Sequence, residues 1–183
     1  MKVTIVRQDV PETRLHVAFN KQMQSASGAG RQAAFVLPGG PGIDHRAYRG
    51  YACLENSVDV IFHDPRGCGA SDPADYRDCN MSNYIDDIES LRQHFNLGKI
   101  VVIGKSYGSM CALGYALRYP DSVAKLVLAA GAPSYRFLDT AKKNLKRLGS
   151  ADQIEICQKL WAGGFSSRDE LLRFFDFPSK IAE

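Results

Sequence analysis

Two overlapping patterns that could do chemistry lie within VVIGKSYGSMCALGYA, which begins at Val101. Gly104-Lys105-Ser106 is typical of the end of a phosphate-binding loop, whereas Gly-x-Ser-x-Gly, ending at Gly108, is typical of a turn that presents a nucleophilic serine. A phosphate loop would need another glycine five residues earlier, where a lysine stands, and a flexible stretch in place of the Ile and Val residues between. Because branched aliphatic residues favour strands, the sequence favours the serine over nucleotide binding.

A strand that runs into Ser106 and a helix that begins directly after it would hold this serine in a strained turn. The residues two positions away on either side come close together in such a turn, and Gly104 and Gly108 have no side chain to obstruct it. The N-terminus of the following helix would direct its free N–H groups at negative charge developing near the serine. We therefore predict that Ser106 is a catalytic nucleophile.

Two glycine-rich segments, each after an apolar run, support this prediction. LPGGPG, at residues 37–42, can offer backbone N–H groups to an oxyanion, because its glycines allow the backbone to approach closely. HDPRGCGASDP, at residues 63–73, places Arg66 between Asp64 and Asp72, and we expect these charges to pair locally. We interpret this second segment as a scaffold that braces the site.

In this order, the three motifs resemble those of the α/β-hydrolase superfamily, and specifically those of the proline iminopeptidase group of serine peptidases. That group carries His-Gly-Gly-Pro-Gly after its third strand, then an Asp-Gln-Arg-Gly-x-Gly-x-Ser loop, then Gly-x-Ser-Trp-Gly. The resemblance covers residues 30–133. The matching segments are Pro38-Gly39-Gly40-Pro41-Gly42, Asp64-Pro65-Arg66-Gly67-Cys68-Gly69-Ala70-Ser71 and Gly104-Lys105-Ser106-Tyr107-Gly108.

This resemblance implies an α/β-hydrolase fold with a mostly parallel sheet, helices on both faces, and a small peptide or ester as substrate. It also implies that the N–H groups of Gly40 and Tyr107 form the oxyanion hole. Because Pro38, Pro65 and Tyr107 depart from the group's pattern, broader aminopeptidases, esterases and lactonases of the same fold are alternatives. The residues that would support the turn and the loops are Gly39, Gly42, Gly104, Gly108, Asp64 and Arg66.

A serine hydroxyl needs a base to accept its proton, and in this fold the acid and the histidine follow the serine in the chain. Here all four histidines, His16, His45, His63 and His94, precede Ser106. We expect His45 to begin a helix and His63 to form a hydrogen bond within its loop, rather than to replace the missing base.

The resemblance therefore implies the N-terminal portion of a hydrolase, truncated within a helical cap and nearly inactive as it stands. A non-catalytic fragment or binding module is the alternative. The apolar segment at 123–131 would then be an exposed sheet edge, so we expect self-association or binding of a complementary C-terminal chain.

Periodicity predicts the elements that position these residues. Apolar runs alternate with amphipathic stretches, which predicts a parallel sheet covered on both faces. We expect a hydrolase core at 1–133 and the start of a helical cap at 134–183. A small-residue loop is predicted at 24–30, strands at 3–8, 15–20, 33–37, 58–64, 99–104 and 123–131, and helices at 45–56, 81–95, 107–120, 135–148, 151–160 and 167–175.

Composition excludes several classes of protein. A net charge of +3 over 183 residues gives no reason to expect nucleic acid, and no apolar run is long enough to span a membrane. Charges at Arg7 and Asp9 interrupt the place where a signal peptide needs its apolar core, so we expect a cytoplasmic protein. We expect no metal and no cofactor, because the cysteines are scattered without metal-ligand spacing, at Cys53, Cys68, Cys79, Cys111 and Cys157.

Overall fold

The computed structural model describes residues 1–19, 31–167, 169, 170 and 172. The predicted loop at 24–30, and most of the predicted helix at 167–175, lie outside the described residues. Contacts divide the chain into two compact units, Met1–Pro133 and Ser134–Glu183. Among the described residues, no helix is long and apolar enough to cross a membrane.

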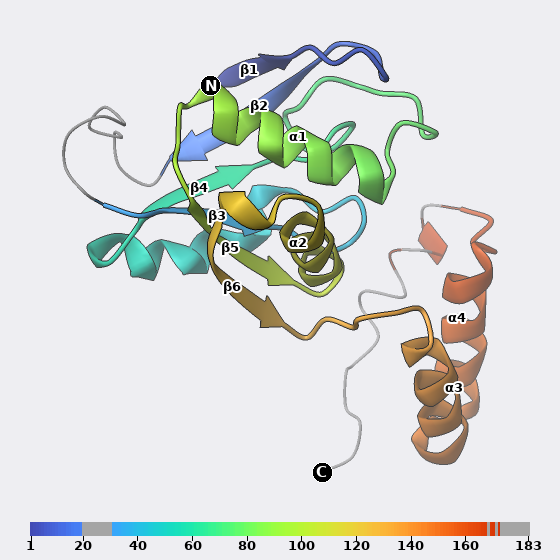
Figure 1. Ribbon diagram of the computed structural model, residues 1–183. Coiled ribbons are helices and arrows are strands. Elements are labelled where there is room, and N and C mark those ends of the chain that lie inside the picture. Colours follow the sequence, from blue (N-terminus) through green and yellow to red (C-terminus); the bar gives the residue numbers. More distant parts are fainter. Residues whose placement is uncertain (20–30, 168, 171, 173–183) are drawn as a thin grey trace. The chain divides into compact units, whose positions relative to one another are not determined.

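The first unit is built around a six-stranded sheet with the strand order β1-β2-β4-β3-β5-β6 (Figure 1). The β3 strand pairs in parallel with β4 and β5, and β5 pairs in parallel with β6, whereas β2 is antiparallel to both β1 and β4. The predicted mostly parallel sheet is therefore confirmed. The strands are β1 (Lys2–Ile5), β2 (Thr13–Phe19), β3 (Ala33–Leu37), β4 (Asp59–His63), β5 (Ile100–Lys105) and β6 (Val123–Ala129).

Both faces of the central strands are covered, which explains why these strands are continuous apolar runs. Every residue of β3 is buried. Because successive side chains point to opposite faces, Phe35 packs into a core with α1 (Met81–His94) and α2 (Tyr107–Arg118), while Ala34 and Val36 pack into a second core on the other face. The helices α1 and α2 lie together beside the sheet in Figure 1.

The second core is closed by the helix η1 (His45–Asn56), which has the predicted bounds but is a 3₁₀-helix. Its apolar residues Tyr48, Tyr51 and Leu54 are spaced three apart and all pack against the sheet. Side chains at this spacing eclipse one another in a 3₁₀-helix, so the helix presents one apolar row to the core. A short second 3₁₀-helix, η2 (Pro120–Ser122), leads into β6.

The second unit contains the helices α3 (Phe137–Leu148) and α4 (Ala151–Ala162), close to the predicted ranges. Ser150 caps α4 by accepting a hydrogen bond from the Gln153 N–H, and the Gln153 side chain accepts one in return from the Ser150 N–H. Gly163 ends α4 in the left-handed conformation. No strand follows β6 among the residues that the structure describes.

Candidate functional site

Ser106 stands between the last residue of β5 and the first residue of α2, as the sequence pattern predicts. Its backbone has φ 55° and ψ −123°, a conformation that residues other than glycine rarely adopt. The Ser106 N–H donates to the carbonyl oxygen of Ala129 at 2.8 Å, which fastens the turn to the end of β6. Ser106 is exposed at the turn, which the predicted role as a nucleophile requires.

The two glycines around this turn are required by close backbone contacts. A Cβ atom at Gly104 would lie 2.3 Å from the Gly108 carbonyl oxygen, and one at Gly108 would lie 2.1 Å from the Leu37 carbonyl oxygen. Both distances are too short for any side chain, so the turn packs directly against the end of β3 as well as against itself.

Ser109 strengthens the same turn, a role that the sequence analysis did not predict. Its hydroxyl oxygen lies 2.7 Å from the Gly104 carbonyl oxygen and accepts a hydrogen bond from the Ala129 N–H at 2.9 Å. The side chain is buried and joins β5, α2 and the end of β6. Sequence spacing indicates only that residue 109 is small, because one of its partners, Ala129, lies on a strand twenty residues away.

The glycine loop after β3 lies against the nucleophile turn. A Cβ atom at Gly39 would lie 3.1 Å from the Ser106 Cβ and 2.9 Å from the Lys105 carbonyl oxygen. The Gly39 N–H donates to the Tyr48 hydroxyl at 2.8 Å, so this N–H is already engaged. The next N–H of the loop belongs to Gly40, whose φ of +114° favours glycine.

Tyr107 provides the second N–H group expected at an oxyanion hole. It is the first residue of α2, and N–H groups in the first turn of a helix have no acceptor within the helix. Gly42 also has a positive φ, of +97°, and a Cβ atom there would meet nothing within 4 Å. The loop conformation, rather than crowding, therefore favours glycine at that position.

A cavity of about 410 Å³ lies beside the glycine loop. Pro38, Gly39 and Tyr107 contribute to its wall, and so does Tyr84 from α1. The rings of Tyr84 and Tyr107 are stacked, with centroids 6.3 Å apart and an interplanar angle of 3°. A volume of this order suits a small ligand, and the cavity shares Gly39 and Tyr107 with the surroundings of Ser106.

The expected pairing of Arg66 with Asp64 and Asp72 is wrong. Arg66 instead forms two bonds with the carboxylate of Asp87 on α1, at 2.7 and 3.1 Å, and both side chains are almost completely buried. Its third contact is to the Pro11 carbonyl oxygen at 2.8 Å.

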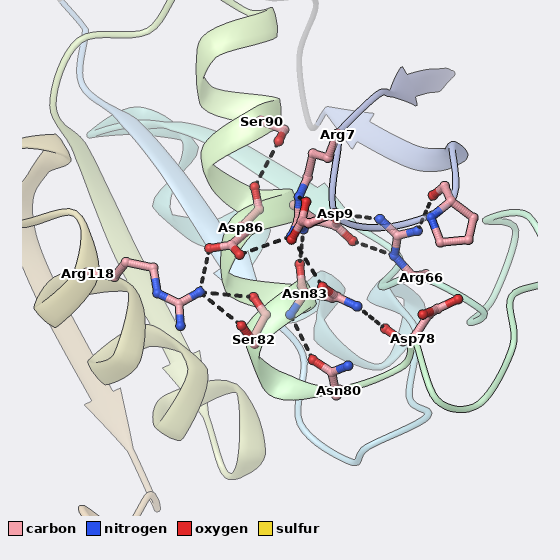
Figure 2. Close-up of polar contacts among 12 residues, drawn as sticks. Arg7, Asp9, Arg66, Asp78, Asn80, Ser82, Asn83, Asp86, Ser90 and Arg118 are labelled. Carbon is pink, nitrogen blue, oxygen red and sulfur yellow. Dashed lines mark hydrogen bonds and ion pairs between the residues drawn. The ribbon is translucent and has the colours of Figure 1, made fainter.

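Arg7 approaches the same carboxylate at 3.3 Å and reaches Asp9 and Asp86 as well (Figure 2). The predicted strand at 3–8 ends at Ile5, and Arg7 turns towards α1 beyond its end. Asp72 pairs with Lys2 at 2.5 Å, whereas Arg66 pairs with the buried Asp87 on α1.

Asp64 supports the loop that follows β4. One carboxylate oxygen accepts hydrogen bonds from the His45 N–H and lies 2.6 Å from the His45 Nδ1, and the other accepts from the Ala70 N–H. Burial opposes ionisation, but these hydrogen bonds lower the pKa of the Asp64 carboxyl. His45 begins η1, as predicted, and its ring is held by this carboxylate.

His16, His45 and Asp64 are the group of described side chains that could hold a metal ion, because their ligand atoms all lie within 4.8 Å of one another. The ring centroids of the two histidines are 5.1 Å apart. A buried hydrogen bond between the His45 ring and the Asp64 carboxylate, 2.6 Å long, explains why these two side chains lie together.

The expected hydrogen bond of His63 within its loop is also wrong. His63 is completely buried between the rings of Phe35 and Tyr84, whose centroids lie 6.3 and 5.4 Å away. Neither ring nitrogen has a hydrogen-bond partner among the described residues. Burial lowers the pKa of His63 to about 4, so the ring is neutral at pH 7 and closed to solvent.

Comparison with known proteins agrees with this geometry. Residues 35–151 match the family model described as the alpha/beta hydrolase fold. The chain is 32% identical to the proline iminopeptidase of Saccharolobus solfataricus, over 80% of this chain and 52% of that protein. It is 30% identical to the proline iminopeptidase of Heyndrickxia coagulans, over 72% of this chain and 46% of that one. The chain thus spans about half the length of the curated relatives it matches.

Solved structures show the same fold. The crystal structure of the Mycobacterium smegmatis proline iminopeptidase superposes with a TM-score of 0.67 at 24% identity, covering 97% of this chain and 60% of that one. The structure of VinJ gives a TM-score of 0.71 at 21% identity, covering 95% and 58%. With its nucleophile turn, its glycine loop and this family match, the chain belongs to the α/β-hydrolase fold family.

Proposed function

We propose that the chain carries the nucleophile and the oxyanion hole of a serine hydrolase, most similar in function to the proline iminopeptidases. The observation that carries the proposal is the strained backbone of Ser106, held where β5 meets α2 by contacts that leave no room for a side chain at Gly104 or Gly108. The relatives that are named proline iminopeptidases support a small peptide as the substrate.

In this proposal, Ser106 Oγ attacks the carbonyl carbon of the scissile bond. The N–H groups of Gly40 and Tyr107 donate to the oxygen, which becomes negatively charged as the tetrahedral intermediate forms. Gly40 is favoured over Gly39 because the Gly39 N–H already donates to Tyr48. Fixed donors of this kind stabilise the transition state without any reorganisation.

The base that accepts the serine proton is proposed to come from residues other than these 183. His63 is closed to solvent, and the Nδ1 of His45 faces the Asp64 carboxylate. The β6 strand pairs with β5 on one side and with no described strand on the other. Val127 and Leu128 on β6 are 46% and 47% exposed, so this edge would suit a complementary chain or a second copy.

The test is a rate measurement on residues 1–183 beside the Ser106→Ala variant, with proline arylamides and nitrophenyl esters as substrates. Loss of the base from a serine triad costs on the order of a millionfold in turnover, so we expect negligible hydrolysis by both chains. Adding a C-terminal segment that bears the acid and the histidine should restore turnover, and Ser106→Ala should abolish it. Preference for the arylamide would support a peptidase, and preference for the ester an esterase.

Rapid turnover by residues 1–183 that is lost in Ser106→Ala would contradict the absence of a base from this segment. A full-length protein that hydrolyses neither substrate would favour the alternative of a binding module. The oxyanion role can be tested separately with Gly40→Pro, which removes the N–H group, excludes the φ of +114°, and should abolish labelling of Ser106 by an activity probe. Undiminished labelling would remove the oxyanion role from Gly40. Circular dichroism should show that this variant keeps its fold.

A further inference from the structure

Two cysteines that are eleven residues apart in the sequence meet at one backbone oxygen. The Cys68 thiol lies 3.6 Å from the Arg66 carbonyl oxygen, and the Cys79 thiol lies 3.5 Å from the same atom. Cys68 belongs to the loop after β4, whereas Cys79 directly precedes Asn80, the residue that caps α1. The two sulfur atoms are therefore neighbours, brought together by the fold.

The backbone of Gly67, the residue before Cys68, also lies close to the Cys79 sulfur. Gly67 has a φ of +72°, and a Cβ atom built on it would lie 2.8 Å from the Cys79 Sγ. The Cys79 sulfur thus rests on the backbone of the residue next to Cys68. A disulfide needs the sulfur atoms about 2.0 Å apart, so its formation requires both side chains to rotate about their Cα–Cβ bonds.

Both thiols can be reached by a small molecule. Cys68 and Cys79 line the cavity of about 410 Å³ described above; Cys79 is exposed and Cys68 is partly buried. Cys111 is buried instead, and neither Cys53 nor Cys157 lines this cavity.

We propose that Cys68 and Cys79 form a dithiol site that a low-molecular-weight disulfide, such as glutathione disulfide, oxidises to an intramolecular disulfide. The thiolate of the exposed Cys79 attacks one sulfur of the reagent, which forms a mixed disulfide and releases one glutathione thiolate. The Cys68 thiolate then attacks the Cys79 sulfur and releases the second glutathione. The protein loses two protons and two electrons, and the reagent is reduced to two thiols.

The disulfide would tie the loop after β4 to the N-terminus of α1. Both segments contribute residues to the cavity, which is also lined by Gly39 and Tyr107. Oxidation would therefore fix one side of a cavity that borders the surroundings of Ser106. This inference rests on the placement of the thiols and does not depend on the proposed hydrolase function.

The experiment treats residues 1–183 with glutathione disulfide at mildly alkaline pH, because burial raises the pKa of both thiols. We expect a mass loss of about 2 Da, the disappearance of two of the five titratable thiols, and reversal by dithiothreitol. Trypsin cleaves after Arg66, Arg77 and Arg92, so Cys68 and Cys79 should appear in two peptides that stay linked until they are reduced.

Single variants identify the order of the steps. Cys68→Ser should stop at the mixed disulfide on Cys79, because the second thiol is missing, while the matched control Cys53→Ser should form the intramolecular disulfide like the wild type. Accumulation of glutathione on both cysteines of the wild type, without linked peptides, would overturn the proposal. So would linked peptides that join other cysteine pairs to the same extent. The peptide map of the wild type decides the question even where a variant fails to fold.

Discussion

Protonation of His63 should weaken the folded state as the pH falls from 7 to 5. The ring is completely buried, and its two nitrogens have no hydrogen-bond partner among the described residues. Burial lowers its pKa from the ordinary 6.5 to about 4. The unfolded chain therefore takes up a proton at His63 in a range of pH where the folded chain does not.

The sign follows from this difference. Where the unfolded state binds more protons, the free energy of unfolding decreases as the pH falls. The stability that His63 contributes is thus fully present above its unfolded pKa and is lost as the pH falls through the interval down to about 4. At about 1.4 kcal/mol per pH unit, the loss between pH 7 and pH 5 is about 2 kcal/mol.

Urea unfolding at pH 7 and pH 5 measures this loss in the wild type, in His63→Leu and in His94→Leu. The leucine at position 63 fills a similar volume and cannot be protonated, so that variant should lose about 2 kcal/mol less than the wild type. His94 is exposed, and its variant should behave like the wild type. Other groups that titrate, such as His16, contribute equally to all three chains and cancel in the comparison.

An equal loss of stability in the wild type and in His63→Leu would refute the reasoning. It would mean that folded His63 takes up a proton near its ordinary pKa, which requires access to water or a partner for the charged ring. His63 would then return as a candidate for the base that serves Ser106.

Three substitutions test the contacts that shape the site. Gly108→Ala should destabilise the chain by about 3 kcal/mol in urea unfolding, because the new Cβ would meet the Leu37 carbonyl oxygen. The control Gly98→Ala places its Cβ in open space and should change the free energy of unfolding by less than about 0.5 kcal/mol. Arg66→Met should lower the free energy of unfolding by about 3 kcal/mol, since it removes the bidentate partner of buried Asp87. The exposed control Arg77→Met should change it by almost nothing, and equal effects of the two variants would contradict the role of burial. Tyr48→Phe removes the acceptor of the Gly39 N–H and should lower the free energy of unfolding, measured by thermal unfolding, by about 1–2 kcal/mol. Tyr51→Phe is its control, and equal stability of the two variants would contradict the importance of this hydrogen bond.

The nucleophile turn could be predicted from the sequence because its geometry is a local steric problem. A strand, a sharp turn and a helix bring residues 104 and 108 into contact, so a side chain at position 104 would strike the Gly108 backbone whatever the rest of the fold does. The requirement for glycine at 108 has a further cause outside the turn, because its Cβ would meet the Leu37 carbonyl oxygen of β3. The alternation of apolar runs and amphipathic stretches likewise determines a covered parallel sheet. The 3₁₀ geometry of η1 is also consistent with its sequence, because Tyr48, Tyr51 and Leu54 are spaced three residues apart.

The partners of the charged side chains could not be predicted in the same way. Asp64 and Asp72 are the acids nearest to Arg66 in the sequence, yet its guanidinium reaches Asp87, which lies on another element. Asp72 pairs instead with Lys2 and Arg14, which lie on β1 and β2 and are 70 and 58 residues away in the sequence. The prediction for His63 was wrong for the same reason. Its ring is buried by Phe35 on β3 and Tyr84 on α1, two elements that are distant from each other in the sequence.

The contacts that hold Ser106 all come from elements within the described core. The end of β3 supplies the Leu37 carbonyl oxygen against which Gly108 packs, and the end of β6 supplies the Ala129 carbonyl oxygen that the Ser106 N–H reaches. Ser109 joins β5 to the end of β6 through its buried hydroxyl. Since β3, β5 and β6 are neighbours in one sheet, contacts within these residues alone determine the position of Ser106. In the proposed hydrolase, a base that docks beside β6 would therefore meet a turn that is already formed, so its arrival should raise the rate of reaction while leaving the backbone of the turn unchanged.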